Sequence, residues 1–203
     1  MGAQAEANVK MGRPRGFCEE AAVEAAMRVF WEKGYEGATL SDLTEAMGIN
    51  RSSMYATFGD KDALFRMAIA RYAEGPAAYL RRALKEPTAR AVAEALLRGA
   101  LELMTDSSHP RGCLSVQGAL ACGTGAERAK QAMIEWRKRG EAEIQKRLQQ
   151  ARTVGDLPRD VNPGDLARYL STVLTGLGIQ AANGATKGEM TRVVEMALRS
   201  MPF

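Results

Sequence analysis

The chain has 203 residues, of which 46% are hydrophobic and 26% are charged, and its net charge at pH 7 is +4. These values are typical of a globular protein with one domain or two small ones, and without an apolar run of about 18 residues we expect no membrane-spanning helix. Residues 1–70 hold eight Lys or Arg against ten Asp or Glu, so the net charge alone does not predict nucleic-acid binding.

The cysteines and the histidine exclude several kinds of site. Cys18, Cys113 and Cys122 are odd in number and widely spaced, which fits neither a disulfide framework nor a CxxC metal pair. His109 is the only histidine, so a metal site, a Ser-His-Asp triad or a Cys-His dyad would lack partners at a motif spacing. We therefore expect no catalytic centre, no metal and no cofactor. The N-terminus has no apolar signal segment, so we expect a cytoplasmic protein.

The N-terminal part begins with a polar arm. Residues 1–16 contain glycines and end in a basic stretch, and we expect them to be a disordered arm. Apolar residues at helical spacing then predict a first helix over residues 18–33. Gly34 is expected to end it in the left-handed conformation.

Two short helices are predicted next from their caps. Thr39, followed by Asp42 three residues later, forms a capping box at the start of the first of them. Gly48 ends that helix, and Asn50 caps a second one over residues 51–58.

The rest of the chain is also predicted to be helical, because β-branched alternation is nearly absent and Ala, Leu, Glu, Arg and Met dominate. Asn162 followed by Pro163 is a strong helix start, and Thr186 with Glu189 forms another capping box. In chain order we expect a long helix from 61 that is interrupted at 75–76, and further helices at about 76–85, 87–104, 113–121, 127–152, 163–182 and 186–199.

Residues 39–58 form a candidate helix-turn-helix, because a Gly-containing turn joins two helices. The residues expected to hold the second helix across the first are Leu40, Leu43, Met47, Ile49, Met54 and Phe58. The outer face of the second helix carries Arg51, Ser52, Ser53, Tyr55 and Thr57. In a helix-turn-helix this face meets base edges in the major groove. Spacing alone also fits a helical hairpin that merely has a polar outer face.

A family resemblance favours the DNA-binding interpretation. The run from "GRPRGF" through "AAMRVFWEKGYEGATLSDLTEAMGINRSSMYATFGDKDALF" is similar to the N-terminal DNA-binding domain of TetR/AcrR-family bacterial repressors, over residues 12 to about 65. The resemblance implies an all-α protein with an arm and helix-turn-helix domain at 1–60. It implies a ligand-binding and dimerisation domain at 61–203. The expected function is a homodimeric regulator of a double-stranded DNA operator, released by an unknown small-molecule inducer, an oxidant or an electrophile.

The resemblance also implies roles for individual residues. Tyr55 and Lys61 match positions that contact phosphates, and Thr39 matches the anchor of the second helix. Positions at or near the bases match Ser41, Arg51, Ser52, Ser53 and Thr57. The family often has glycine or proline at the position of Ser52 and histidine at that of Thr57, so base preference cannot be copied from relatives. The arm residues Lys10, Arg13 and Arg15 are expected to contact phosphate or the minor groove, unless the arm is a solubilising tail.

A ligand pocket is expected among the middle helices. Its candidates are Phe65, Met67, Tyr72, Tyr79, Leu101, Met104, Leu114, Val116, Met133 and Trp136. Each of them could equally be an ordinary core residue. Because no buried charge is evident, we expect an apolar or weakly polar ligand.

The last two predicted helices are candidates for dimerisation, because the apolar band of 163–182 is wider than burial on one side requires. Together they would form a four-helix interface across a two-fold axis, unless 163–182 is a buried helix of a monomer. The interface candidates are Leu166, Leu170, Val173, Leu174, Leu177, Val193 and Val194.

Cys113, in "RGCLSVQGALAC", is a candidate sensor. It follows Arg111 and lies near the expected start of a short helix, and both features favour a thiolate. The segment resembles a subgroup of the family in which some members sense electrophiles or oxidants through cysteine. The alternative is a small buried hydrophobic residue. For the whole chain, the alternative function is a helical ligand-binding protein or enzyme whose helix-turn-helix is only structural.

Overall fold

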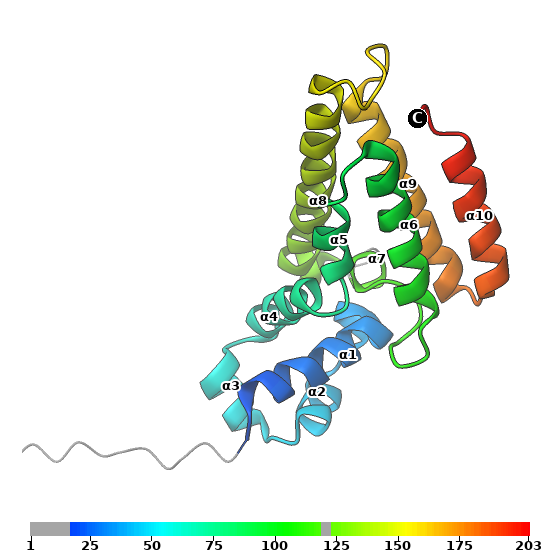
Figure 1. Ribbon diagram of the computed structural model, residues 1–203. Coiled ribbons are helices and arrows are strands. Elements are labelled where there is room, and N and C mark those ends of the chain that lie inside the picture. Colours follow the sequence, from blue (N-terminus) through cyan, green and yellow to red (C-terminus); the bar gives the residue numbers. More distant parts are fainter. Residues whose placement is uncertain (1–16, 119–122) are drawn as a thin grey trace, which may run out of the picture.

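The computed structural model describes residues 17–118 and 123–203, and within these ranges every regular element is helical (Figure 1). In chain order the elements are α1 (Glu19–Gly37), α2 (Leu40–Met47), α3 (Arg51–Phe58), α4 (Lys61–Glu74), α5 (Ala78–Ala83), α6 (Ala89–Thr105), α7 (Leu114–Gln117), the 3-10 helix η1 (Thr124–Ala126), α8 (Glu127–Thr153), α9 (Pro163–Ala182) and α10 (Lys187–Arg199).

The predicted caps of the first small helices are present. Thr39 and Asp42 form the reciprocal capping box of α2, and Gly48 ends that helix with a φ of 64°. Asn50 Oδ1 accepts a hydrogen bond from the Ser53 N–H at 2.8 Å and so caps α3. Because each cap satisfies N–H groups that the first turn of a helix leaves unpaired, the short helices α2 and α3 are defined locally by sequence.

Gly34 interrupts α1 rather than ending it. It has φ 70° and ψ 172°, and one further helical turn follows to Gly37, four residues beyond the predicted end. A positive φ strains any residue with a side chain, which explains the glycine. The kink removes the Tyr35 N–H from the helical ladder, and this N–H donates instead to the Gly118 carbonyl at 2.7 Å.

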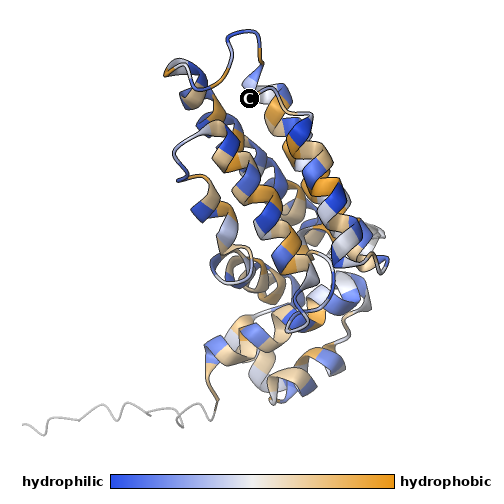
Figure 2. Cartoon of the chain, turned by 45° about the vertical axis from the view of Figure 1, so that its right-hand side comes forward, coloured by the Kyte–Doolittle hydropathy of each residue, from blue (hydrophilic) through white to orange (hydrophobic). Residues whose placement is uncertain are grey.

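The C-terminal part is a bundle in which the long helices α6, α8, α9 and α10 stand side by side above the α1–α3 layer (Figure 1). Contacts join α9 to both α8 and α6, and α10 to α6. Hydrophobic and hydrophilic residues alternate around these helices (Figure 2), as expected for helices with one buried face.

The two parts share a continuous core, because α4 packs along α1 while also contacting α5, α7 and α8. At this junction the rings of Phe30 and Phe65 lie edge to face at 4.9 Å, and those of Trp31 and Tyr72 do so at the same distance.

Two predicted helices are shorter than expected. The predicted helix 76–85 is α5, of six residues, and the predicted helix 113–121 is α7, of four; its last expected residues, 119–121, lie outside the described ranges. In the described part of the chain, no helix combines the length and the apolar character needed to cross a bilayer.

Candidate DNA-binding surface and sensor site

The outer face of α3 is open. Met54 and Phe58 point into the core, whereas Arg51, Ser52 and Tyr55 are exposed, Tyr55 by 49%. Ser53 and Thr57 are half-buried. The inward pair at i and i+4 therefore fixes which face of α3 is presented, and that face carries the predicted base and phosphate contacts.

Arg51 is held by α2. Its Nη2 donates to the Ser41 Oγ at 2.9 Å, so two predicted base contacts from different helices lie side by side. A guanidinium has five N–H donors, and this bond uses one of them. The group can therefore meet a base edge while it remains near Ser41.

The start of α2 is fixed by a small polar network. Thr39 donates from its N–H and its hydroxyl to Asp42 Oδ2, and Lys33 Nζ lies 2.8 Å from Asp42 Oδ1. The hydrogen bond from Lys33, followed by those from Thr39, lowers the pKa of Asp42 to about 2. The Asp42 carboxylate thus stays charged at neutral pH and holds α2 to the end of α1.

Lys61, the first residue of α4, lies beside Tyr35. Its Nζ is 4.5 Å from the centre of the Tyr35 ring, a cation–π geometry. The Tyr35 hydroxyl donates to Asp62 Oδ1 at 2.6 Å. The predicted arm contacts Lys10, Arg13 and Arg15 lie outside the described residues.

Most of the predicted ligand-pocket residues are buried. Six of the eight principal candidates are at most 5% exposed and pack in the core: Phe65, Tyr72, Leu101, Met104, Leu114 and Met133. Trp136 is half-buried, and Met67, which faces away from the core on α4, is 41% exposed. A side-chain list read from the sequence could not distinguish the inner from the outer face of α4.

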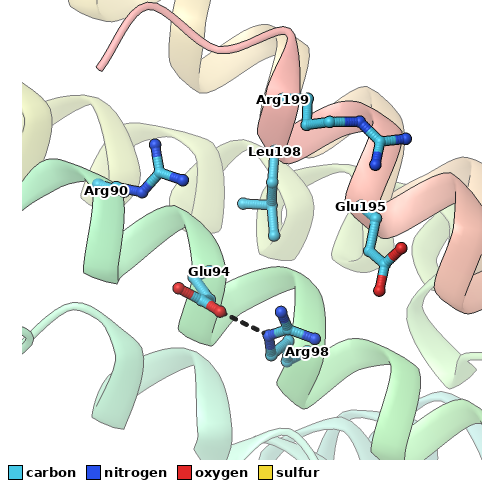
Figure 3. Close-up of a pocket in the computed structure, with 6 residues that line it drawn as sticks. All are labelled: Arg90, Glu94, Arg98, Glu195, Leu198 and Arg199. Carbon is cyan, nitrogen blue, oxygen red and sulfur yellow. Dashed lines mark hydrogen bonds and ion pairs between the residues drawn. The ribbon is translucent and has the colours of Figure 1, made fainter.

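Two open grooves lie elsewhere. One, of about 270 Å³, separates α6 from α10 and is lined by Arg90, Glu94, Arg98, Glu195, Leu198 and Arg199 (Figure 3). Another, of about 600 Å³, lies between α4 and α8 and includes Arg66, Arg128, Gln131 and Ile134. Both are open to solvent and are lined largely by charged residues of both signs, unlike the enclosed sites that bury most of a small molecule.

Cys113 lies in a buried polar cluster. The residue is 7% exposed, and its Sγ is 3.2 Å from the Tyr72 hydroxyl and 3.0 Å from the Ser115 Oγ. Burial, followed by electrostatic interaction with Cys113, raises the pKa of Tyr72 well above its usual value, so the phenol keeps its proton. Arg137 of α8 donates to the Ser115 carbonyl and interacts electrostatically with Cys113.

Two sequence features suggested an activated Cys113 thiol, namely the neighbouring Arg111 and the start of a helix. In the structure neither acts on the thiol as expected. Arg111 donates to the Ala185 carbonyl at 3.3 Å, and the structure assigns it no contact with Cys113. Cys113 is indeed the N-cap of α7, but α7 has only four residues and hence little macrodipole. The nearby cation is Arg137, 24 residues further along the chain, which no local sequence signal could have indicated.

The predicted dimer residues divide into two groups. Leu166, Leu170, Leu177 and Val194 are at most 6% exposed and form part of the core of their own chain. Val173 and Leu174 are half-buried, and Val193 is 49% exposed. The apolar side chains left open on α9 and α10 are Tyr169, Ile179, Val193 and Met196. Met196 was not among the predicted interface residues, although it lies on α10 only three residues after Val193.

In the described part of the chain, no three His, Cys, Asp or Glu side chains are grouped so that they could hold a metal ion. The architecture and the open face of α3 instead define a helix-turn-helix protein with a helical C-terminal bundle.

Comparison with known proteins then gives the family. Residues 22–68 match the family described as "Bacterial regulatory proteins, tetR family", and residues 90–197 match "Tetracyclin repressor-like, C-terminal domain". The chain therefore belongs to the TetR family of bacterial regulatory proteins and is a DNA-binding transcriptional regulator. These matches favour a functional helix-turn-helix over a merely structural one.

The similarity to known proteins extends over nearly the whole chain. The transcriptional repressor ComR of Escherichia coli (strain K12) is 28% identical over 193 residues, covering 94% of this chain and 92% of ComR. BdcR of the same organism, also a transcriptional repressor, is 27% identical over 191 residues, covering 92% and 90%. A solved cysteine mutant of the regulator CifR, complexed with 26bp double-strand operator DNA, is 40% identical with a TM-score of 0.90 and covers 94% of this chain and all of that one.

Proposed function

We propose that the protein is a homodimeric transcriptional repressor that binds operator DNA through α3 and leaves it when Cys113 reacts with an oxidant or an electrophile. The DNA-binding part of this proposal rests on the exposed polar face of α3, on which Arg51 is oriented by its hydrogen bond to Ser41. ComR and BdcR are named repressors, and the CifR mutants are bound to operator DNA. These similarities support the same role here.

The contacts on DNA divide by chemistry. Arg51, Ser52, Ser53 and Thr57 lie on α3 where base edges would be met, and Ser41 lies beside them on α2. Tyr55 and Lys61 are assigned to phosphates, which position the protein without selecting a sequence. Thr39 keeps α2 in place through its capping box.

Dimerisation is assigned to α9 and α10. Tyr169, Ile179, Val193 and Met196 leave 40% to 66% of their surfaces exposed in a single chain, and a group of exposed large apolar residues marks an interaction surface. A second copy related by a two-fold axis would cover the group on both chains at once. Two α3 helices would then face successive major grooves, about 34–36 Å apart.

Regulation is assigned to the thiol of Cys113. With a peroxide, sulfur would take one oxygen as the O–O bond breaks, giving a sulfenic acid and water. With an electrophilic alkene, the thiolate would form a C–S bond and the adjacent carbon would receive a proton. Either product is larger than the thiol, and its site is 7% exposed and in contact with Tyr72 and Ser115. Because a packed interior cannot accept added volume without shifting, α7 would move.

The test is a gel shift with DNA from upstream of the protein's own gene, before and after treatment with dilute peroxide or N-ethylmaleimide. Wild-type protein, Cys113→Ser and Cys18→Ser are compared, and mass spectrometry records which thiols react. Cys18 is a useful control because it is exposed, and the structure gives its side chain no helix-capping hydrogen bond.

The expected result is binding by all three untreated proteins and loss of binding after treatment in wild type and Cys18→Ser only. If the protein binds neither the upstream DNA nor any genomic fragment, the proposed repressor function is refuted. Full binding by wild-type protein whose Cys113 is modified would refute the cysteine switch while leaving the repressor intact.

A further inference from the structure

Tyr35 connects the helix that follows Cys113 with a predicted phosphate contact. We propose that Tyr35 is a positioning residue that holds Lys61 for its phosphate, and that α7 controls this position through the backbone of Tyr35. The inference rests on the proposed DNA-binding function. It adds the route by which a change at Cys113 reaches the DNA-binding surface.

The α7 end of this connection is a backbone contact. The kink at Gly34 releases the Tyr35 N–H, which donates to the carbonyl of Gly118, the residue after α7, at 2.7 Å. A Cβ atom at position 34 would lie 3.3 Å from the Gln117 carbonyl oxygen, so the two segments are in close contact. Since a backbone hydrogen bond is short and directional, a displacement of Gly118 weakens this bond unless the Tyr35 backbone moves with it.

The DNA-facing end is a side-chain contact. The Tyr35 ring is 8% exposed and lies 5.1 Å from the ring of Phe65, while its hydroxyl is bonded to Asp62. Lys61 Nζ lies over the same ring at 4.5 Å. A lysine has a long flexible stem, and the ring restricts the positions available to its ammonium group. Fixing that group before binding lowers the entropy cost of a phosphate contact.

Cys113 and the Gly118 carbonyl lie at opposite ends of the same short helix, α7. Cys113 is the N-cap of α7 and Gly118 is its C-cap, so only the four residues of α7 separate them. Displacement of α7 by a modified Cys113 would therefore reach Gly118, then the Tyr35 backbone, then the ring under Lys61. The predicted consequence is the loss of one phosphate contact per chain.

Salt dependence measures such a contact directly. Each phosphate contact contributes about −0.9 to the slope of log K against log salt, so losing Lys61 in both chains of a dimer should make the slope shallower by about 1.8. At about 0.15 M salt, the loss of each contact corresponds to a roughly fivefold weaker affinity. A merely structural role for Tyr35 would lower the amount of folded protein without changing this slope.

The first experiment compares operator binding over a range of salt for wild type, Tyr35→Leu, Tyr35→Phe, Lys61→Met and Tyr35→Leu/Lys61→Met. Tyr35→Leu should make the slope as shallow as Lys61→Met does, and the double variant should show no further change. Tyr35→Phe, which keeps the ring, should restore the wild-type slope. Thermal unfolding of each variant confirms that folded protein is being compared. A wild-type slope in folded Tyr35→Leu would overturn the positioning role.

The second experiment moves the end of α7 without any thiol reagent. In Gly118→Ala the new Cβ would lie 2.6 Å from the Leu114 carbonyl and 3.3 Å from Phe65, so the segment must shift. Gly125→Ala is the matched control, because among the described residues nothing beyond its chain neighbours lies within 4 Å of its Cβ position. In a protein that keeps Lys61, Gly118→Ala should make the slope of log K against log salt shallower. In the Lys61→Met protein it should leave that slope unchanged. Gly125→Ala should leave the slope unchanged in both proteins.

These outcomes separate the inference from the function on which it rests. Wild-type protein that fails to bind DNA refutes the proposed function. Wild-type protein that binds, with equal effects of Gly118→Ala in the Lys61 and Lys61→Met backgrounds, refutes the connection through Tyr35 alone.

Discussion

Arg51 of α3 and Ser41 of α2 are hydrogen-bonded to each other, with 2.9 Å between Nη2 and Oγ. The two residues are ten positions apart and lie on different helices of the helix-turn-helix. The Ser41 hydroxyl thus restricts the position of the guanidinium, and a restricted group loses less conformational entropy when it contacts a base.

Arg51→Ala should change which DNA sequence is preferred. The lost contact should cost about 1–3 kcal/mol at the base it meets and relax selection at that position. Lys61→Ala and Tyr55→Phe should instead weaken binding to all sequences alike, because phosphates carry no sequence information. Selection of binding sites from random DNA with each variant tests this. A changed consensus with Lys61→Ala and an unchanged one with Arg51→Ala would reverse the assigned roles.

Asp42 should make stability depend on pH in the acid range. Hydrogen bonds from Lys33 and Thr39 lower its pKa from 3.8 to about 2. A lowered folded-state pKa means that the stabilisation is complete above about pH 4 and is lost as pH falls towards 2. Asp42→Asn should therefore lower the melting temperature at neutral pH, and the difference from wild type should shrink over that window. A difference that stays constant down to pH 2 would show that the charge of Asp42 contributes nothing.

Val193→Glu should weaken the dimer. Val193 is 49% exposed on α10, where a second chain is expected to cover it, and an unpaired carboxylate buried there should raise the dissociation constant at least about tenfold, since a tenfold change needs only 1.4 kcal/mol. Val154→Glu is the control, because Val154 is 79% exposed just after α8. Light scattering over a concentration series measures both. If wild-type protein is monomeric at micromolar concentration, the interface does not exist.

Gly99→Ala should destabilise the bundle although alanine favours helices. A Cβ atom at position 99 would lie 2.5 Å from the Tyr79 ring, and overpacking of this kind costs typically about 1–3 kcal/mol. Gly140 lies in α8, and among the described residues nothing outside its own stretch of helix comes within 4 Å of its Cβ position. Gly140→Ala should therefore stabilise by up to about 1 kcal/mol. Urea unfolding of both variants gives the comparison. Equal stabilisation by both would mean that the α5–α6 packing is loose enough to absorb a methyl group.

Structural features that depend on residues close together in the sequence could be predicted from the sequence. The caps at Thr39, Asn50 and Thr186 are present as expected, since a cap needs only a suitable side chain two or three residues before the N–H it satisfies. The exposed face of α3 was predictable for the same reason, because Met54 and Phe58 orient the helix on their own.

Features that depend on how helices pack could not be predicted in this way. The exposure of Met67 and the burial of Leu170 follow from which side of α4 or α9 meets a neighbour, and both sides carry apolar residues. Arg111 is only two positions from Cys113 in sequence but bonds to Ala185, while Arg137, 24 positions away, interacts electrostatically with the thiol. Loop direction and helix order decide such contacts, and neither has a local signal.

The most direct measurement for the central claim is the sequencing of genomic DNA fragments retained by the purified protein. A homodimer that binds through two α3 helices predicts enrichment of fragments with an inverted repeat, whose half-site centres lie about 10–10.5 bp or a multiple apart. One of the enriched fragments should lie upstream of a regulated gene. Retention of fragments without a shared inverted repeat, or of none above background at low salt, would contradict the account.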